Sequence, residues 1–196
     1  VRAPAGPAVV GVAAPPSAVA PAAGPPAPGG VLKEWRAGWP RSGSDLNVAR
    51  KRGSPQSWLW GFSSADERPA LAPALETWLR DGLPRAGTII LKSAWFNAGR
   101  STATTPETIA WLRRVWNREA TVPGLPLSEN DETDLALDLA LRGATDAQAL
   151  LDAQEARITN PDRKARFVFV RPALADSAAT REALFERFKD VANRRR

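Results

Sequence analysis

From residue 64 onward, side chains that begin helices recur along the chain at short intervals. Ser, Thr, Asp and Asn cap a helix because their oxygen accepts a hydrogen bond from a free backbone N–H of the first turn. The sequence predicts such caps at Ser64 (with Glu67), Thr105, Ser128 (with Asp131), Thr145 (with Gln148), Asn160 and either Asp176 or Ser177. Helices this short, joined by short turns, predict an all-α fold, a stack of antiparallel helical hairpins like part of an α-solenoid.

Apolar side chains follow these caps at helical spacing, and glycines mark where helices stop. The first stripe comprises Leu71, Leu75, Trp78 and Leu79, and it ends near Gly82. Residues 122–127 contain two prolines and a glycine, which predicts a loop. Residues 166–171 have strand propensity, but the cap at Asn160 and the lack of a pairing strand favour a helix. Four tryptophans are expected in the core or between hairpins, namely Trp78, Trp95, Trp111 and Trp116.

The first part of the chain has a different composition. Residues 1–30 include eight prolines and no aliphatic side chain larger than Val, so they cannot bury enough surface to order themselves. We expect residues 1–43 to be a disordered or artefactual tail. Residues 44–196 are expected to be a fragment of a helical-repeat C-terminal domain, truncated at both ends. The absence of Met from the chain favours a fragment or a start at an alternative codon.

The composition also limits the chemistry. The chain has no Cys and no His, which excludes thiolate nucleophiles, Cys-ligated metals and a Ser-His-Asp triad. The formal net charge is +6, and the basic excess of residues 157–196 (11 basic against 5 acidic) is expected to be a solvated helical surface. We therefore expect no nucleic-acid partner. No apolar run reaches the length of a membrane span.

Several segments resemble a known family. Residues 160–167, Asn-Pro-Asp-Arg-Lys-Ala-Arg-Phe, with their continuation to residue 174, resemble the C-terminal helical region of bacterial aminopeptidase N-like (alanyl aminopeptidase type) gluzincin zinc metallopeptidases. Supporting similarity lies at 45–48, 58–62, 94–101, 105–106, 111–116, 126–129 and 185–196. The resemblance thus covers about 44–196.

The resemblance implies a part of an enzyme rather than a whole one. Family members hydrolyse N-terminal residues from peptides, using zinc held by His-Glu-x-x-His and a further Glu in a preceding catalytic domain. This chain contains no His and so no such motif, and no catalytic or metal-ligating residue is predicted in it. Zinc is implied only for the parent enzyme. We expect a helical domain that packs on upstream domains, caps the active site and shapes the peptide cavity, and that is inactive alone.

Four basic residues are the candidates for contact with substrate in that cavity, namely Arg163, Lys164, Arg166 and Arg171. A guanidinium can bind a carboxylate through two hydrogen bonds. The sequence nevertheless favours ordinary solvated charges, or pairs with Asp162 and other nearby acids. The acidic run at Asp131, Glu132, Asp134 and Asp138 lacks the spacing and glycine of a calcium loop and is not predicted to bind a cation.

A second function class stays open. The chain could be a stand-alone helical-repeat module that binds acidic partners through its basic last forty residues. Such a module would melt cooperatively as a monomer and bind in a salt-dependent way.

Overall fold

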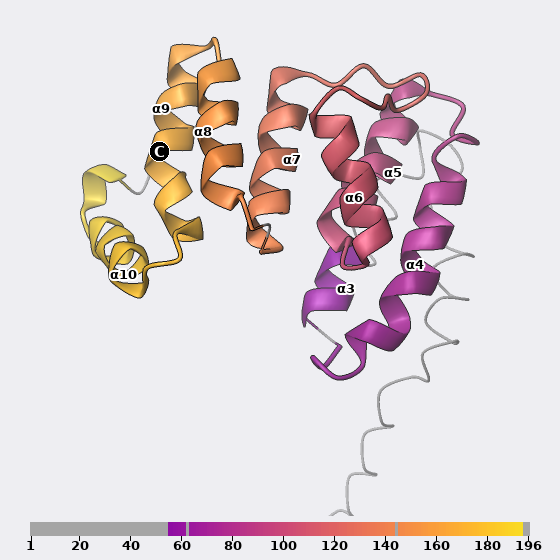
Figure 1. Ribbon diagram of the computed structural model, residues 1–196, viewed down its shortest axis with the longest axis horizontal. Helices are drawn as coiled ribbons and strands as arrows, with labels where there is room; N and C mark the ends of the chain where they lie inside the picture. Colours follow the sequence, from indigo (N-terminus) through magenta and orange to yellow (C-terminus); the bar gives the residue numbers. More distant parts are fainter. Residues whose placement is uncertain (1–54, 62, 144, 194–196) are drawn as a thin grey trace, which may run out of the picture.

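The computed structural model describes residues 55–61, 63–143 and 145–193 (Figure 1). The expected tail at 1–43 lies outside the described residues. Within the described ranges every regular element is a helix, which confirms the all-α prediction. The elements are α3 (Pro55–Gly61), α4 (Arg68–Gly82), α5 (Ile89–Thr102), α6 (Pro106–Trp116), α7 (Glu129–Leu141), α8 (Ala147–Arg157), α9 (Pro161–Val170), η2 (Arg171–Leu174), α10 (Ala178–Arg187) and η3 (Val191–Asn193).

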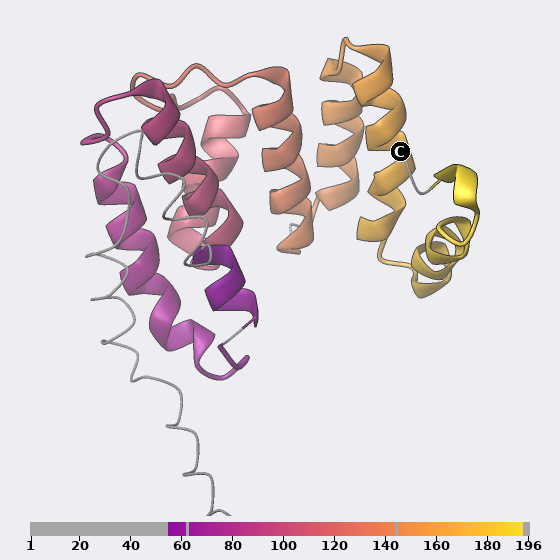
Figure 2. The same cartoon turned by 180° about the vertical axis from the view of Figure 1, so that it is seen from behind.

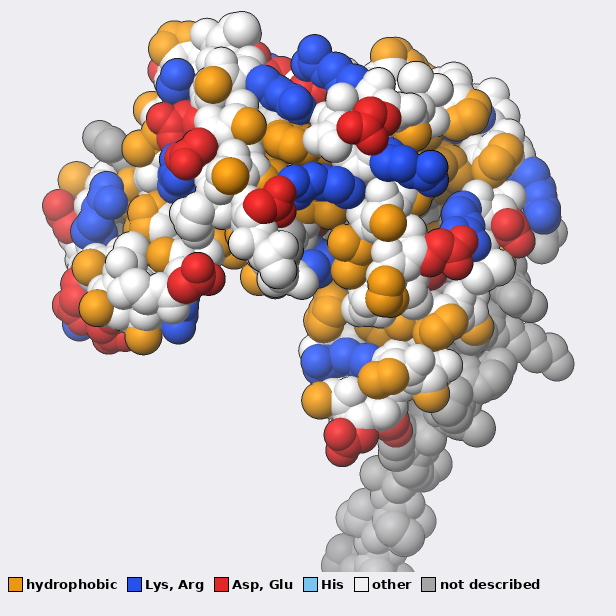
Figure 3. Space-filling view, in the orientation of Figure 1, with side chains coloured by type: hydrophobic (Ala, Val, Ile, Leu, Met, Phe, Trp, Pro, Cys, Tyr) orange, Lys and Arg blue, Asp and Glu red, His pale blue; other side chains and the backbone are white. Residues whose placement is uncertain are grey.

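The helices stand side by side in a curved row. Successive helices α4 and α5, α6 and α7, and α7 and α8 contact each other, and η2 links α9 to α10. Figures 1 and 2 show α3–α6 grouped at one end of the row and α10 lying across the other end. The underside is hollowed between α10 and α3 (Figure 3). This is the stack of hairpins that the caps predict.

Most of the predicted caps are confirmed. The hydroxyls of Thr105, Ser128 and Ser177 and the Asn160 side chain each accept a hydrogen bond from the first turn of the next helix. Ser128 also forms the reciprocal capping box with Asp131. Thr88, which the sequence pattern did not indicate, caps the start of α5.

Two predicted starts differ in the structure. Ser64 and Glu67 do exchange hydrogen bonds, but α4 begins only at Arg68, because Pro69 lacks an N–H and therefore belongs in a first turn. The box predicted at Thr145 is wrong. Asp146 occupies the N-cap position of α8 without a side-chain cap, and its carboxylate pairs instead with Arg113 of α6.

The core consists of two groups of apolar side chains. The larger one runs through α5–α9 and includes fully buried Leu112, Leu135, Leu151 and Phe167. The smaller one joins α3, α4 and α5 through Leu59, Leu75, Leu79 and Ala98. Of the four tryptophans assigned to the core or hairpin interfaces, Trp116 is buried and Trp78, Trp95 and Trp111 pack half-buried against the two groups, which confirms that assignment.

A buried carboxylate fastens α4 to the start of α6. Glu76 is 4% exposed. Its Oε1 accepts hydrogen bonds from the backbone N–H groups of Thr104 (2.6 Å) and Thr105 (3.0 Å) and from the Thr104 hydroxyl (2.9 Å). Its Oε2 accepts from the Thr105 hydroxyl. Because Thr105 is itself the N-cap of α6, this carboxylate fixes the helix start from a neighbouring helix.

A network of ion pairs joins α5 to α7. Arg100 donates to Asp134 (2.9 Å) and to Asp138, while Arg142 pairs with Asp138 and donates to the carbonyl groups of Ser101 and Ala103. Burial raises the pKa of Asp138, although Arg100 and Arg142 act against that rise. Burial likewise lowers the pKa of Arg142. These charges hold the last turn of α5 against α7.

Candidate functional site

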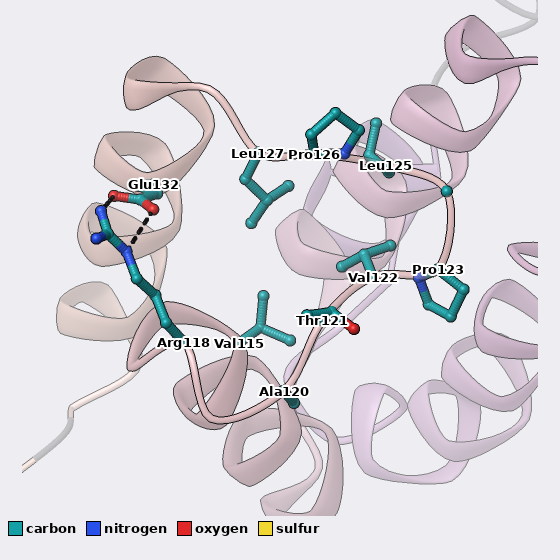
Figure 4. Close-up of a pocket in the computed structure, with 11 residues that line it drawn as sticks. Val115, Arg118, Ala120, Thr121, Val122, Pro123, Leu125, Pro126, Leu127 and Glu132 are labelled. Atoms are coloured by element: carbon teal, nitrogen blue, oxygen red, sulfur yellow. Dashed lines mark hydrogen bonds and ion pairs between the residues drawn. The ribbon is translucent and has the colours of Figure 1, made fainter.

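A groove lies beside the loop that joins α6 to α7 (Figure 4). Its volume is about 350 Å³, and apolar side chains make up most of its wall. An ion pair lies at one end of the groove, on the side of α7 (Figure 4). The residues that line it are Val115, Arg118, Ala120, Thr121, Val122, Pro123, Gly124, Leu125, Pro126, Leu127 and Glu132.

The end of α6 sets the position of Arg118. The N–H of Arg118 donates to the Val115 carbonyl (3.0 Å), and the N–H of Glu119 donates to the Arg114 carbonyl (2.9 Å). These two bonds form a Schellman motif, in which the residue after the cap adopts a left-handed conformation and is usually Gly. Arg118 occupies that place with φ 64° and is the only described non-glycine residue with positive φ.

A bidentate ion pair fixes the guanidinium of Arg118 against α7. Its Nε lies 3.1 Å from Glu132 Oε1, and its Nη2 lies 2.9 Å from Glu132 Oε2. The hydrogen bonds and the charge of Glu132 raise the pKa of Arg118. The Glu132 side chain is only 15% exposed, whereas the Arg118 side chain is 67% exposed. The guanidinium is therefore held in one orientation with its outer edge in solvent.

The loop supplies the opposite wall of the groove. Val122 and Leu125 are buried and anchor the loop in the larger core. Gly124 has φ +71°, a conformation that favours glycine. A Cβ placed on Gly124 would lie 3.0 Å from Lys92 Cε and 3.6 Å from its Nζ, so the ammonium of Lys92 lies beside this part of the loop.

A chain of hydrogen bonds holds the last turn of α6 against α8 and α7. Trp116 Nε1 donates to Gln154 Oε1 (2.8 Å), and Gln154 Nε2 donates to the Thr133 hydroxyl (3.1 Å). Gln154 and Trp116 are buried, so the hydrogen bond between them satisfies two polar groups that have little access to water. Arg157 stacks over the Trp116 ring, 4.1 Å from its centroid, and donates to the Trp116 carbonyl. Helices α6, α7 and α8 therefore meet at one rigid point.

The structure places the basic residues singled out in the sequence on α9 and η2, and none of them lines the groove. Arg171 donates to Asp152 (2.7 Å) and to Glu155 (2.6 Å) of α8. Arg163 lies 3.4 Å from Glu129 of α7. Both arginines thus take part in ion pairs between helices, although their acidic partners differ from Asp162.

Lys164 and Arg166 have other surroundings. Lys164 is half-buried and Arg166 is exposed, and neither side chain forms an ion pair within the described ranges. The structure therefore does not gather the four basic side chains into one site. Their predicted contact with substrate stays a prediction.

The acidic run on α7 is distributed among separate structural contacts. Asp131 caps its own helix, Glu132 holds Arg118, and Asp134 and Asp138 hold Arg100. Glu129 accepts hydrogen bonds from the hydroxyl and the N–H of Thr159, which together lower its pKa. In the part of the chain that the structure describes, no cluster of three or more metal-ligating side chains occurs. Nor does any described helix combine the length and hydropathy needed to cross a bilayer.

The groove itself was not predicted. Residues 122–127 were identified as a loop, and the loop is confirmed. The sequence did not indicate that Arg118 ends α6, because the left-handed position of a Schellman motif is normally occupied by Gly. Its pair with Glu132 joins two helices across that loop and depends on how they pack.

Comparisons of the chain with protein-family models, with curated proteins and with solved structures find no match. The class of protein is therefore defined by the fold and the site alone: an all-α array of helical hairpins with an apolar groove beside the α6–α7 loop. The resemblance to the zinc aminopeptidases stays a prediction.

Proposed function

We propose that this chain is the helical domain of an aminopeptidase N-like zinc peptidase, and that it serves as a scaffold over the active site rather than as a catalyst. The residues that carry the resemblance support this proposal through their structural roles. Asn160 caps α9, and Phe167, at the end of the most specific string, is 1% exposed in the core. The string therefore encodes a helix start and a packing residue, as a scaffold requires.

The observation that carries the proposal is the apolar surface at the α10 end of the row. Phe185, Phe188 and Val191 are 61%, 41% and 69% exposed. Large exposed apolar side chains that lie close together are typical of a surface that packs against another domain or chain. The scaffold role accounts for this surface, since a helical domain must pack on the rest of its enzyme.

The native protein provides the test. An antibody raised against the α6–α7 loop peptide would recover the protein from its source cells under native conditions. We expect the recovered protein to be much larger than 21.1 kDa, the mass of this chain, and to cleave an aminoacyl p-nitroanilide. A zinc chelator should abolish this cleavage. The recombinant 196-residue chain should show no cleavage under the same conditions. Recovery of a 21 kDa protein without peptidase activity would overturn the proposal.

The second candidate is a stand-alone interaction module. The groove beside the α6–α7 loop favours it, because Arg118 and Lys92 place positive charge near an apolar wall. A cooperative melt and a monomeric mass for the recombinant chain would support this module. Aggregation and binding of a hydrophobic dye would support the scaffold instead, because the α10 end would then lack its covering domain.

A further inference from the structure

We propose that the groove beside the α6–α7 loop is a docking site for an extended segment of a partner protein, one that carries an acidic side chain next to aliphatic ones. This inference does not depend on the aminopeptidase assignment. It rests on the shape of the groove, its apolar wall and the two cations near it.

The size and lining of the groove suit a short aliphatic segment. A volume of about 350 Å³ lies at the lower end of the range for ligand pockets and accommodates a few side chains. Val115, Val122, Leu125 and Leu127 present branched aliphatic groups to it (Figure 4). None of the lining residues is aromatic, so the groove offers no platform on which a nucleic-acid base could stack.

The charges at the groove favour an acidic partner. Arg118 uses Nε and one N–H of Nη2 for Glu132, which leaves the outer edge of its guanidinium, with Nη1, free for a second carboxylate. Lys92 lies beside Gly124 and forms no ion pair with the described residues. The carboxylate of Glu132 is already engaged by Arg118, and Glu119 accepts a hydrogen bond from Asn117. An arriving carboxylate therefore finds free N–H donors on Arg118 and an ammonium on Lys92 that no described carboxylate pairs.

Arg118 is also held ready for such a contact. Its backbone lies in the left-handed region, where a Cβ is unfavourable, and its side chain is clamped by a nearly buried carboxylate. Binding to a guanidinium that is already fixed costs less side-chain entropy than binding to one that must first become ordered. Because Gly suits a left-handed position, Arg118→Gly removes the guanidinium without straining the backbone. It also leaves the nearly buried carboxylate of Glu132 without its partner, so the double variant Arg118→Gly/Glu132→Gln isolates the loss of the guanidinium.

The test uses two capped tetrapeptides, acetyl-Val-Leu-Glu-Leu-amide and its Gln counterpart, titrated into the 15N-labelled 196-residue chain. We expect saturable shifts of the amide signals of Val122, Leu125 and Leu127. The Glu peptide should bind about fivefold more tightly than the Gln peptide, the scale expected of one exposed ion pair. Arg118→Gly, alone or with Glu132→Gln, should remove most of this difference, and Lys92→Gln should reduce it.

Arg114→Ala provides the matched control, because Arg114 is an exposed arginine in the last turn of α6, shortly before Arg118. This control should leave both affinities unchanged. Equal binding of the two peptides, an unchanged preference in Arg118→Gly, or shifts confined to other parts of the chain would overturn the proposal. Inorganic phosphate that shifts the same three signals as strongly would also overturn it, since the site would then attract any anion.

Discussion

Glu76 offers a sharp test of how this fold is held together. Replacing it with Ala removes the only acceptor that the described structure gives to the backbone N–H groups of Thr104 and Thr105. It also removes the acceptor for both threonine hydroxyls, although these can rotate toward other partners. Since the site is nearly closed to solvent, the two N–H groups would be left poorly satisfied.

The expected cost follows from these contacts. An unsatisfied buried donor costs about 1–3 kcal/mol, and loss of negative charge at a helix start costs about 0.5 kcal/mol more. The substitution also removes the desolvation penalty of a buried carboxylate, which offsets part of this cost. We therefore expect Glu76→Ala to lower the free energy of unfolding by about 3 kcal/mol. Glu76→Gln should cost about half as much, because the amide keeps one acceptor oxygen.

Urea unfolding of the full chain, followed by tryptophan fluorescence and by circular dichroism, measures these changes. Glu182→Ala is the matched control, because Glu182 is exposed on α10 and forms no ion pair with the described residues. Its loss should change the free energy of unfolding by no more than about 0.5 kcal/mol. A cost below about 1 kcal/mol for Glu76→Ala, or an equal cost for the control, would refute the reasoning.

Three further predictions concern packing, buried polarity and pH. Gln154→Leu leaves the Trp116 indole N–H without its partner and should cost about 2 kcal/mol in the same urea assay. Gly82→Ala places a Cβ 2.2 Å from the Trp95 ring and should also cost about 2 kcal/mol, with a perturbed near-ultraviolet tryptophan spectrum. The lowered pKa of Glu129 makes its contribution to stability complete above the ordinary value of 4.5 and lost as pH falls toward the lowered value. In acid titrations, the free energy of unfolding of Glu129→Gln should therefore fall less steeply below pH 4.5 than that of the unsubstituted chain. An equal slope would contradict this prediction.

Much of the helical framework could be predicted from the sequence. Thr105, Ser128 and Asn160 begin helices where their side chains indicate, because a cap bonds to backbone groups two or three residues away. The same local reason made residues 122–127 a loop. The segment at 166–171, with strand propensity, is helical through Val170 because its cap and its packing outweigh that propensity.

The candidate site was beyond such prediction. The four basic residues on α9 and η2 stand out by charge, but charge alone does not say which acids they meet. Arg171 meets Asp152 and Glu155 because α8 and α9 are neighbours in the array. The groove requires α6, its loop and α7 together, so no local pattern announces it.

The sequence by itself determined the all-α class, the main helix starts and the absence of His and Cys chemistry. These properties depend on composition and on contacts within one turn of the backbone. Only the tertiary structure decided that Asp146 pairs with Arg113 instead of allowing a cap at Thr145, and that Arg118 is fixed in a left-handed conformation against Glu132. Those outcomes depend on side chains that are 14 or more residues apart in the chain and meet only when helices pack.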